Sequence, residues 1–419
     1  MKTVKNKVST PIVDYITEYA ASDTSRLHMP GHKGKAPDFL PEGFKETYRY
    51  DITEITGADD LYTPSGIIKE SEENASEIFG AKTFYSPEGS SLSVKAMIYL
   101  ALKHYERNSD SNTEAAASKS NGILLKNKPS PYIITVGTCH KSFFHATGLL
   151  NIETERIENR NHSGTQNAGD LLPEIQKILS GKKAAPIGLY VTCPDYFGNI
   201  LNLKELKNIL SGMNIPLLVD AAHGAYFKFL DKEKYAEYTH PVDSGADLCC
   251  TSAHKTLPAL TGAAYLHVNE SFLDVYPLAK HAMEIFGSSS PSYLILASLD
   301  AFNAEAAKYK EDLSKTCVRI ERLKNDLSGM GFHIKKSDPL RIVVLKDELH
   351  SGKDFASSLR KHRCEYECFD DGYVILMLTP YNSEADFYRI REAFETVKNR
   401  PGDFEILPEN GYNCLKNFS

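Results

Sequence analysis

The chain has 419 residues, of which 42% are hydrophobic, and carries a formal net charge of −7. A chain of this length can bury a large core, and we expect about two domains. It contains no run of about eighteen apolar residues, the length that would span a bilayer, so we expect a soluble protein. Basic residues are scattered rather than gathered in a stripe and tryptophan is absent, which argues against a nucleic-acid partner.

The N-terminus and the cysteines indicate a cytoplasmic protein. The first residues are basic, but no apolar run follows them, so we expect no secretory signal. The eight cysteines have irregular spacing, form no CxxC pair and often lie in apolar runs, which predicts buried free thiols. They are Cys139, Cys193, Cys249, Cys250, Cys317, Cys364, Cys368 and Cys414.

The segment from His28 to Lys35 (HMPGHKGK) has two histidines four residues apart, a spacing that could bind a metal on a helix. The Pro-Gly between them is incompatible with a regular helix, and no nearby carboxylate or cysteine completes a ligand set. We therefore expect no metal site here, and interpret the segment as a basic loop at a substrate entrance.

Residues 86–93 (SPEGSSLS) lie between a short predicted strand and an apolar helix that we expect to run to about Tyr105. Backbone N–H groups and hydroxyls at a helix start can bind phosphate, and Gly89, Ser90 and Ser91 are the candidates. The spacing does not match the GxxxxGK[ST] of a P-loop. A serine-rich helix cap with a turn glycine explains the segment equally well.

Short apolar runs then alternate with segments of helical periodicity, a pattern typical of a parallel sheet covered by helices. Residues 131–136, 187–191 and 215–220 are predicted to be buried strands. Ligands of open α/β sheets bind at the carboxyl ends of the strands. Two polar stretches without periodicity, 107–129 and 152–170, are interpreted as surface insertions.

His140 follows the predicted strand at 131–136 and is followed by Lys141 and Ser142. A histidine at this edge could lie against an aromatic ring and transfer a proton, because the ordinary imidazole pKa is near neutrality. A helix-capping or structural histidine is the more common explanation of such a residue.

Asp220 ends the predicted strand at 215–220, where its carboxylate could pair with a pyridinium nitrogen. His223 could hydrogen-bond a phenolic oxygen or a substrate. The alternatives are an N-cap aspartate and a buried structural histidine.

Lys255 follows Asp220 by one strand–helix–strand interval, and Ser252 and His254 beside it could bind phosphate. An amine that forms a Schiff base, a carboxylate that keeps a pyridine protonated and a phosphate-binding loop are what pyridoxal 5'-phosphate requires. The sequence therefore predicts this cofactor, with Lys255 as the Schiff-base lysine and Lys141 as its rival.

Beyond residue 290, a long helix at about 303–328, strands at 340–345 and 373–378, and a capping box at Ser383–Asp386 indicate a second α/β unit. We predict an N-terminal arm (1–30), a large cofactor-binding domain (31–290) and a small C-terminal α/β domain (291–419).

Six motifs occur in order over most of the chain: His28–Gly34, Asp51–Leu61, His140–Ser142, Asp220–Ala225, Ser252–Leu257 and Ser288–Tyr293. Together they resemble the Orn/Lys/Arg decarboxylase major-domain family of fold type I pyridoxal-phosphate enzymes. The resemblance is to its short bacterial arginine/lysine decarboxylase-like members, which lack an N-terminal wing domain. It implies a large, mostly parallel seven-stranded sheet sandwiched by helices and a smaller C-terminal α/β domain.

The resemblance also implies roles for the candidate residues. Lys255 would form the Schiff base, Asp220 would pair with the pyridine nitrogen, His140 would stack on the ring and His223 would lie near the cofactor's oxygen. The phosphate would be held by Ser90, Ser91, Ser252 and His254. The family forms homodimers or larger assemblies with active sites at the interface, to which Ser288–Tyr293 would contribute from the neighbouring subunit.

The expected reaction is decarboxylation of arginine, lysine or ornithine to the amine and carbon dioxide. Ala221 and Leu260–Ala264 depart from the family's pattern, which affects the expected substrate more than the cofactor. The substrate's distal cation needs an acidic receptor. Available acids are Asp59, Asp60, Glu365 and Glu367, although a solvated surface charge is the ordinary role of each.

Two alternatives remain at this point. An aminotransferase or β-lyase could use the same lysine and aspartate, with Arg341 as the anchor of the substrate carboxylate. The second alternative is a protein that binds the cofactor but does not convert amino acids.

Overall fold

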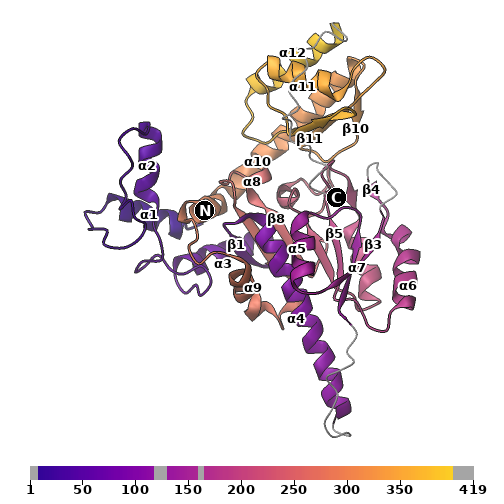
Figure 1. Cartoon of the computed structure of the whole chain (residues 1–419). Helices are drawn as coiled ribbons and strands as arrows, with labels where there is room; N and C mark the ends of the chain where they lie inside the picture. Colours follow the sequence, from indigo (N-terminus) through magenta and orange to yellow (C-terminus); the bar gives the residue numbers. More distant parts are fainter. Residues whose placement is uncertain (1–7, 118–129, 159–164, 400–419) are drawn as a thin grey trace, which may run out of the picture.

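The computed structural model describes residues 8–117, 130–158 and 165–399. Its larger sheet consists of β1 (Lys82–Ser86), β2 (Tyr132–Val136), β3 (Glu153–Ile157), β5 (Leu189–Thr192), β7 (Leu217–Asp220), β8 (Leu248–Ser252) and β9 (Ala264–Val268). The strand order is β1-β9-β8-β7-β5-β2-β3, and helices flank the sheet (Figure 1). Strands β3, β2, β5, β7 and β8 are parallel, whereas β9 is antiparallel to β8 and β1. The predicted mostly parallel, seven-stranded sheet is confirmed.

The central strands are continuous apolar runs because helices cover both faces of the sheet. Every residue of β2 and β7 is buried. The flanking helices are α3 (Ile67–Phe79), α4 (Gly89–Ala117), α5 (Lys141–Leu149), α6 (Leu172–Gly181), α7 (Leu203–Ser211), α8 (Ala253–Thr256) and α9 (Ala279–Phe286). A short parallel pair, β4 (Thr165–Gln166) and β6 (Ile200–Leu201), lies apart from the main sheet.

The C-terminal part of the described chain contains a second, antiparallel sheet. Its strands are β10 (His333–Lys335), β11 (Arg341–Leu345), β12 (Cys368–Asp370) and β13 (Tyr373–Met377), in the order β10-β11-β13-β12. Helices α11 (Gly352–Lys361) and α12 (Glu384–Asn399) belong to this part, and α10 (Tyr293–Gly329) leads into it (Figure 1). The predicted smaller α/β unit is confirmed, while the divisions at residues 30 and 290 remain predictions.

The start of α12 has the predicted capping box. The Ser383 N–H donates to the Asp386 carboxylate at 2.7 Å, and the Asp386 N–H donates to the Ser383 hydroxyl at 3.3 Å. By contrast, α10 begins at Tyr293, well before the predicted start near residue 303.

The interpretation of residues 152–170 as a surface insertion is wrong where the structure describes them. The interpretation of residues 107–129 stays a prediction, because their described part extends a helix that projects from the body (Figure 1). Helix α4 continues to Ala117, past its predicted end near Tyr105, and residues 153–157 form β3. Because β3 is an edge strand with mostly solvent-facing side chains, it lacks the apolar run of a central strand. Residues 118–129 and 159–164 lie outside the described part.

The remaining composition-based expectations concern thiols and membranes. Within the described residues all cysteines are free, and all except Cys364 are buried; Cys414 lies outside this part. None of the described helices is long and apolar enough to cross a membrane.

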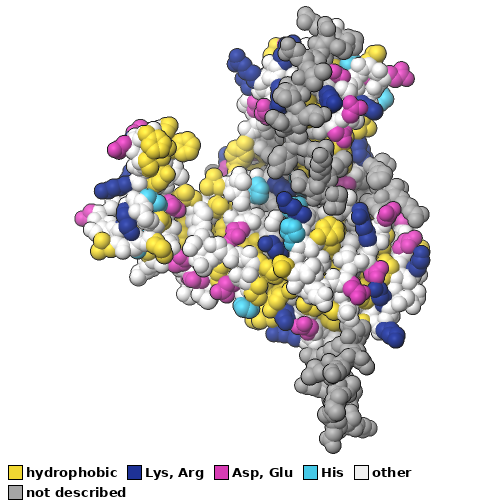
Figure 2. All heavy atoms as spheres, viewed as in Figure 1, with side chains coloured by type: hydrophobic (Ala, Val, Ile, Leu, Met, Phe, Trp, Pro, Cys, Tyr) yellow, Lys and Arg dark blue, Asp and Glu magenta, His cyan; other side chains and the backbone are white. Residues whose placement is uncertain are grey.

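The N-terminal helices α1 (Pro11–Ala21) and α2 (Glu42–Tyr50) project from one side of the molecule (Figure 1). We call residues 22–50 the N-terminal lobe. Hydrophobic side chains gather on its surface (Figure 2). They include Leu27, Met29, Phe39 and Phe44, which are 93%, 70%, 84% and 65% exposed. No residue of α2 is buried within the chain.

The start of α1 is fixed by a carboxylate on α10. Asp300 is fully buried and accepts hydrogen bonds from the N–H groups of Ile12 (2.9 Å) and Val13 (3.0 Å). The Ser71 hydroxyl donates to its other oxygen at 2.6 Å. An acidic group at a helix N-terminus is stabilising, yet burial raises the pKa of Asp300 to about 6.

This pKa predicts a pH-dependent contribution to stability. Between about pH 4 and pH 6 the folded state binds more protons at Asp300 than the unfolded state, so its contribution to the free energy of unfolding falls as the pH rises. Asp300→Asn removes this titration. We expect the stability of the parent protein relative to Asp300→Asn to fall over this range, as measured by urea unfolding. A difference that does not change with pH would contradict the assignment.

Candidate active site

The candidate site begins with Asp220, the last residue of β7, which is 2% exposed. Its carboxylate accepts hydrogen bonds from the Tyr190 hydroxyl at 3.0 Å and from the Ala222 N–H at 3.1 Å, and the Cys250 thiol lies 3.6 Å away. No Lys, Arg or His of the described chain forms an ion pair with it. A buried charge that has only neutral donors is incompletely compensated, so this position suits a further cation.

Lys255 lies on α8, directly after β8, with its Nζ 3.1 Å from Nε2 of His223. Burial lowers the pKa of Lys255, and the charge of Asp220 opposes this shift. Burial, followed by the charge of Lys255, lowers the pKa of His223 well below its ordinary value. Nδ1 of His223 is buried and has no hydrogen-bond partner among the residues that the structure describes. The pair therefore offers an amine whose neutral form is favoured by burial, and an unused ring nitrogen.

The predicted phosphate-binding residues meet where β8 ends and α4 begins. The Ser252 hydroxyl donates to the Ser90 hydroxyl at 2.8 Å, and Ser91 follows in the first turn of α4. The Gly89 N–H is occupied, since it donates to the Gly262 carbonyl at 2.6 Å. Gly89 has a φ of +74°, a left-handed conformation that favours glycine. The two hydroxyls and the helix N-terminus form an anion-binding arrangement.

His254 and His140 have one ring nitrogen engaged locally. Nδ1 of His254 bonds the Ala263 carbonyl at 2.9 Å. Nδ1 of His140 caps α5 by accepting from the Ser142 N–H at 3.3 Å. Burial lowers the pKa of both imidazoles. The capping explanation of His140 is therefore correct, but it leaves the ring beside the site.

His140 is close enough to Asp220 and Lys255 for both charges to affect its pKa after burial has lowered it. Its neighbour Lys141 is exposed in the first turn of α5. Lys255, by contrast, is in contact with His223 inside the site, so the geometry favours Lys255 over the exposed Lys141 as the candidate.

Two tyrosines at this edge are missing from the sequence-based prediction. Tyr190 on β5 bonds Asp220, as described above. Tyr196, just after β5, places its ring edge-on to His223 with centroids 5.4 Å apart, and its hydroxyl donates to Glu367 at 2.6 Å. Their only sequence signal is a position at or just after the carboxyl end of a predicted strand.

Arg341, on β11 of the smaller sheet, is 1% exposed and forms an ion pair with Asp338. Its charge contributes to the lowered pKa of both Lys255 and His223, which places it near the site. Within the described ranges, Nε and Nη2 of its guanidinium are buried and have no hydrogen-bond partner. The smaller sheet therefore supplies a fixed cation with unused donors.

Three of the four acids considered for the distal cation have other roles. Asp59 accepts from the N–H groups of Ser65, Gly66 and Ile68 at the start of α3. Asp60 accepts from two N–H groups of the following turn. Glu365 bonds Arg360 at 3.3 Å. Glu367 is the one that contacts a residue of the site.

The first and last of the six sequence motifs, His28–Gly34 and Ser288–Tyr293, make no described contact with the candidate site residues. His32 pairs with Asp51 at 3.0 Å, while His28 lies 2.6 Å from the Tyr19 hydroxyl. The described residues contain no group of three metal-ligating side chains. Ser288 to Ser290 are exposed, and the Ser288 N–H donates to Glu88 at 2.6 Å. The contribution of Ser288–Tyr293 to a neighbouring subunit remains a prediction.

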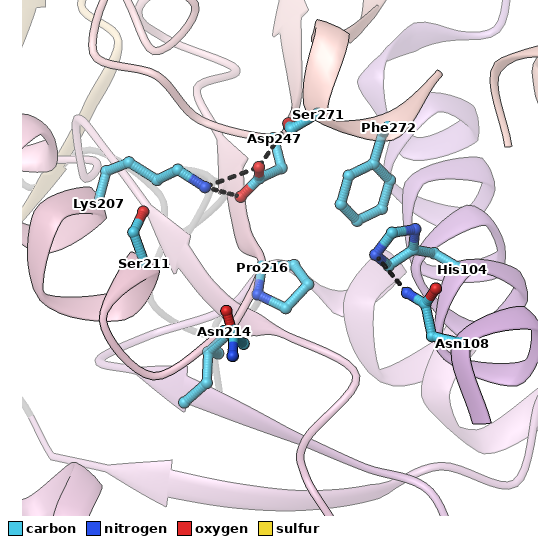
Figure 3. A pocket seen from close by; sticks show the side chains of 10 residues that line it. His104, Asn108, Lys207, Ser211, Asn214, Pro216, Asp247, Ser271 and Phe272 are labelled. Carbon is cyan, nitrogen blue, oxygen red and sulfur yellow. Dashed lines mark hydrogen bonds and ion pairs between the residues drawn. The ribbon is translucent and has the colours of Figure 1, made fainter. Parts of the chain in front are cut away.

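A separate cavity of about 410 Å³ lies at the opposite, amino-terminal edge of the sheet (Figure 3). Lys207 and Asp247 form an ion pair at 2.6 Å there, and Ser271 donates to Asp247. The ring of His104 stacks on Phe272 with centroids 4.1 Å apart. Because its charged groups bind one another, we assign this cavity a structural role.

The residues at the carboxyl edge fit pyridoxal phosphate. A carboxylate without an ion pair matches a protonated pyridine nitrogen, and the unpartnered Nδ1 of His223 matches a phenolic oxygen. A buried lysine amine matches an aldehyde, and the hydroxyls at the start of α4 match a phosphate.

Comparison with known proteins agrees with this chemistry. Residues 10–342 match the model of the family described as Orn/Lys/Arg decarboxylase, major domain. The uncharacterized protein YaaO of Bacillus subtilis is 30% identical over 88% of this chain and 74% of its own length. Arginine decarboxylase of the same organism is 27% identical over 95% of this chain and 79% of its own length.

Among solved structures, the lysine decarboxylase LdcF of Francisella novicida has a TM-score of 0.73 at 17% identity. The match covers 94% of this chain and 60% of LdcF, so the chain spans less than two thirds of that protein. At this identity the likeness shows a shared fold. Taken with the family match, it completes the assignment: the chain belongs to the Orn/Lys/Arg decarboxylase family of pyridoxal-phosphate-dependent amino-acid decarboxylases.

Proposed function

We propose that this protein decarboxylates a basic L-amino acid, namely arginine, lysine or ornithine, to the corresponding amine and carbon dioxide. The observation that carries the proposal is the buried Asp220 carboxylate, which lies close to a buried lysine amine and, in the part of the chain that the structure describes, has neutral donors and no ion pair. Support for a basic substrate comes from the family and from relatives named arginine decarboxylase. We also propose that the protein acts in the cytoplasm.

Lys255 and Asp220 would hold the two reactive ends of the cofactor. The Lys255 amine would bind the aldehyde, and burial promotes the neutral amine that this bond requires. Asp220 would keep the pyridine nitrogen protonated, because its buried carboxylate favours a cation beside it. When bound, the cofactor supplies an electron sink for the cleavage of the bond to the carboxylate.

The remaining residues would orient the cofactor and move protons. Ser90, Ser91, Ser252 and His254 would hold the phosphate at the start of α4, and His223 would donate to the phenolic oxygen through Nδ1. His140 would lie against the ring. Either His140 or Lys255 would return a proton to the carbon that loses the carboxylate.

A second candidate function, transamination or β-elimination, is favoured by one observation. The guanidinium of Arg341 is buried beside the site with two unpartnered nitrogens, and planar N–H donors of this kind bind carboxylates bidentately. An α-carboxylate anchored in this way would be retained rather than lost. The product distinguishes the two functions, since this chemistry yields a keto acid.

The first prediction concerns products. The purified protein, reconstituted with pyridoxal phosphate, is incubated separately with L-arginine, L-lysine and L-ornithine, and amines and carbon dioxide are measured by mass spectrometry. We expect agmatine, cadaverine or putrescine. Lys255→Ala should lower the rate about a thousandfold or more, whereas the control Lys141→Ala should retain it.

Two results would count against the proposal. A keto acid in place of the amine would support the second candidate. Absence of an amine from all three amino acids, although the visible absorbance of the bound cofactor is present, would exclude decarboxylation of these substrates.

We further propose that the protein is a homodimer or larger assembly with shared active sites, in which the N-terminal lobe contacts a second copy. Supporting this, Phe39 and Phe44 on the lobe are largely exposed, and α2 buries no residue within the chain. Exposed apolar surface on a projecting segment is typical of an interface. A twofold assembly would cover the same surface on both copies.

The prediction that follows concerns molecular mass. Phe39→Asp combined with Phe44→Asp should convert the assembly to monomers, because two charges would have to be buried at the contact. Light scattering coupled to size-exclusion chromatography measures the mass. Glu46→Gln on α2 is the control, and should leave the mass unchanged. A monomeric parent protein, or an unchanged mass in the double variant, contradicts this role of the lobe.

A further inference from the structure

The donors that surround the Asp220 carboxylate in the described part of the chain differ in strength. One carboxylate oxygen accepts from the Ala222 N–H at 3.1 Å, and the Cys250 thiol lies 3.6 Å from the same oxygen. The other oxygen accepts from the Tyr190 hydroxyl at 3.0 Å. A thiol is a weak donor and the N–H belongs to the backbone. Tyr190 is therefore the strong side-chain donor to Asp220 among the described residues.

The register of the sheet explains how Tyr190 reaches this carboxylate. Tyr190 lies opposite Leu218 in the pairing of β5 with β7, and Thr192 lies opposite Asp220. Side chains two residues apart in a strand lie on the same face of a sheet, so Tyr190 and Asp220 are diagonal neighbours on one face. Tyr190 therefore approaches Asp220 from the interior of the sheet, and not from the carboxyl edge where the cofactor is proposed to bind.

Packing and burial keep the Tyr190 hydroxyl in this role. Tyr190 is fully buried, and the ring of the fully buried Phe143 on α5 packs against its ring with centroids 4.4 Å apart. Burial, followed by the charge of Asp220, raises the pKa of Tyr190 well above its ordinary value, so the hydroxyl keeps its proton. Since a buried hydroxyl without a partner is unfavourable, the hydrogen bond to Asp220 is the preferred arrangement.

A fixed donor affects where a shared proton lies. In the proposed contact, the pyridine nitrogen of the cofactor and the carboxylate of Asp220 compete for the same proton. A hydrogen bond donated to an ionised carboxyl group stabilises its charged form. A carboxylate stabilised in this way leaves the proton on the nitrogen, where it makes the ring a better electron sink.

We infer that Tyr190 is a positioning residue, whose hydroxyl holds Asp220 in the ionised form that keeps the pyridine nitrogen of the cofactor protonated. The inference rests on the proposed function, in which Asp220 pairs with that nitrogen, and deepens it. Tyr190 acts through Asp220 and not on the substrate, so its loss should slow the reaction without weakening substrate binding.

The first readout is the protonation of the nitrogen itself. The protein is reconstituted with pyridoxal phosphate whose ring nitrogen is isotopically labelled, and the chemical shift of this nitrogen is measured by solid-state NMR. We expect a protonated nitrogen in the parent protein. In Tyr190→Phe the signal should move towards that of an unprotonated pyridine. Phenylalanine keeps the ring that packs against Phe143 and removes only the hydroxyl.

Tyr265→Phe is the matched control. Tyr265 is a fully buried tyrosine of β9 in the same sheet, and its hydroxyl has no hydrogen-bond partner within the described residues. Its substitution should leave the nitrogen signal and the kinetic constants unchanged. A second control uses Asp220→Ala, which removes the group through which Tyr190 acts. In that background Tyr190→Phe should not move the signal further.

Kinetics provide a second readout. With the amino acid that the parent enzyme decarboxylates, we expect Tyr190→Phe to lower kcat about tenfold and to change KM less than about threefold. Circular dichroism and the melting temperature show whether each variant is folded. A variant that had merely lost its structure would lose cofactor and substrate binding together, and would not show a shifted nitrogen signal with an intact KM.

The outcomes are distinguishable. An unchanged nitrogen signal in Tyr190→Phe overturns the inference, even if kcat falls. An equal shift in Tyr265→Phe also overturns it, because the effect would then not depend on the contact with Asp220. If the parent protein forms no amine but its nitrogen signal responds to Tyr190→Phe alone, decarboxylation is wrong and the role of Tyr190 stands. If the nitrogen of the parent protein is unprotonated, the proposed role of Asp220 and this inference fail together.

Discussion

The structure depends most on a buried carboxylate that forms no ion pair with any residue in the described part of the chain. Asp220 ends a fully buried strand, where removal from water is expensive for a charge. Among the described residues its donors are all neutral: a tyrosine hydroxyl, a backbone N–H and a nearby thiol. Burial raises the pKa of Tyr190 and Cys250, so both stay protonated beside it. A protonated pyridine would complete the compensation, as we propose for the bound cofactor.

Sheet topology brings the other groups to that carboxylate. Strands β7 and β8 are parallel neighbours, with Asp220 in register with Cys250, so the segments that follow both strands meet at one edge. Lys255 comes from the segment after β8, and His223 from the segment after β7. The smaller sheet adds Arg341 and Glu367. The candidate site thus combines strand ends of one sheet with side chains from the other.

Much of the fold was predictable from sequence, because central parallel strands are apolar runs that end in polar residues. The strands that contain Ile134, Tyr190 and Leu218 followed this rule, and the sheet confirms them. Edge strand β3 did not, since its exposed side chains are polar. The long α4 was also underestimated, because a helix that projects from the body needs no continuous apolar stripe.

The sequence predicted the residue types of the candidate site, but not which partners each side chain binds. Sequence identified Asp220, His223 and Lys255 from their order after successive strands, and the structure brings them together. The sequence could not show that Asp59 caps a helix while Glu367 contacts a residue of the site. An acid caps a helix only where backbone N–H groups point towards it, which the sequence does not show. Tyr196 was missed for a related reason, since its contacts are with residues distant in the sequence.

The central claim is that Lys255 is the lysine that holds the cofactor. The most direct test is to reduce the reconstituted protein with borohydride, which makes the bond between cofactor and lysine permanent, and to map the modified peptide by mass spectrometry. The account predicts a cofactor-derived mass on Lys255, absent from Lys255→Ala. Modification of Lys141 or of another lysine instead would contradict it.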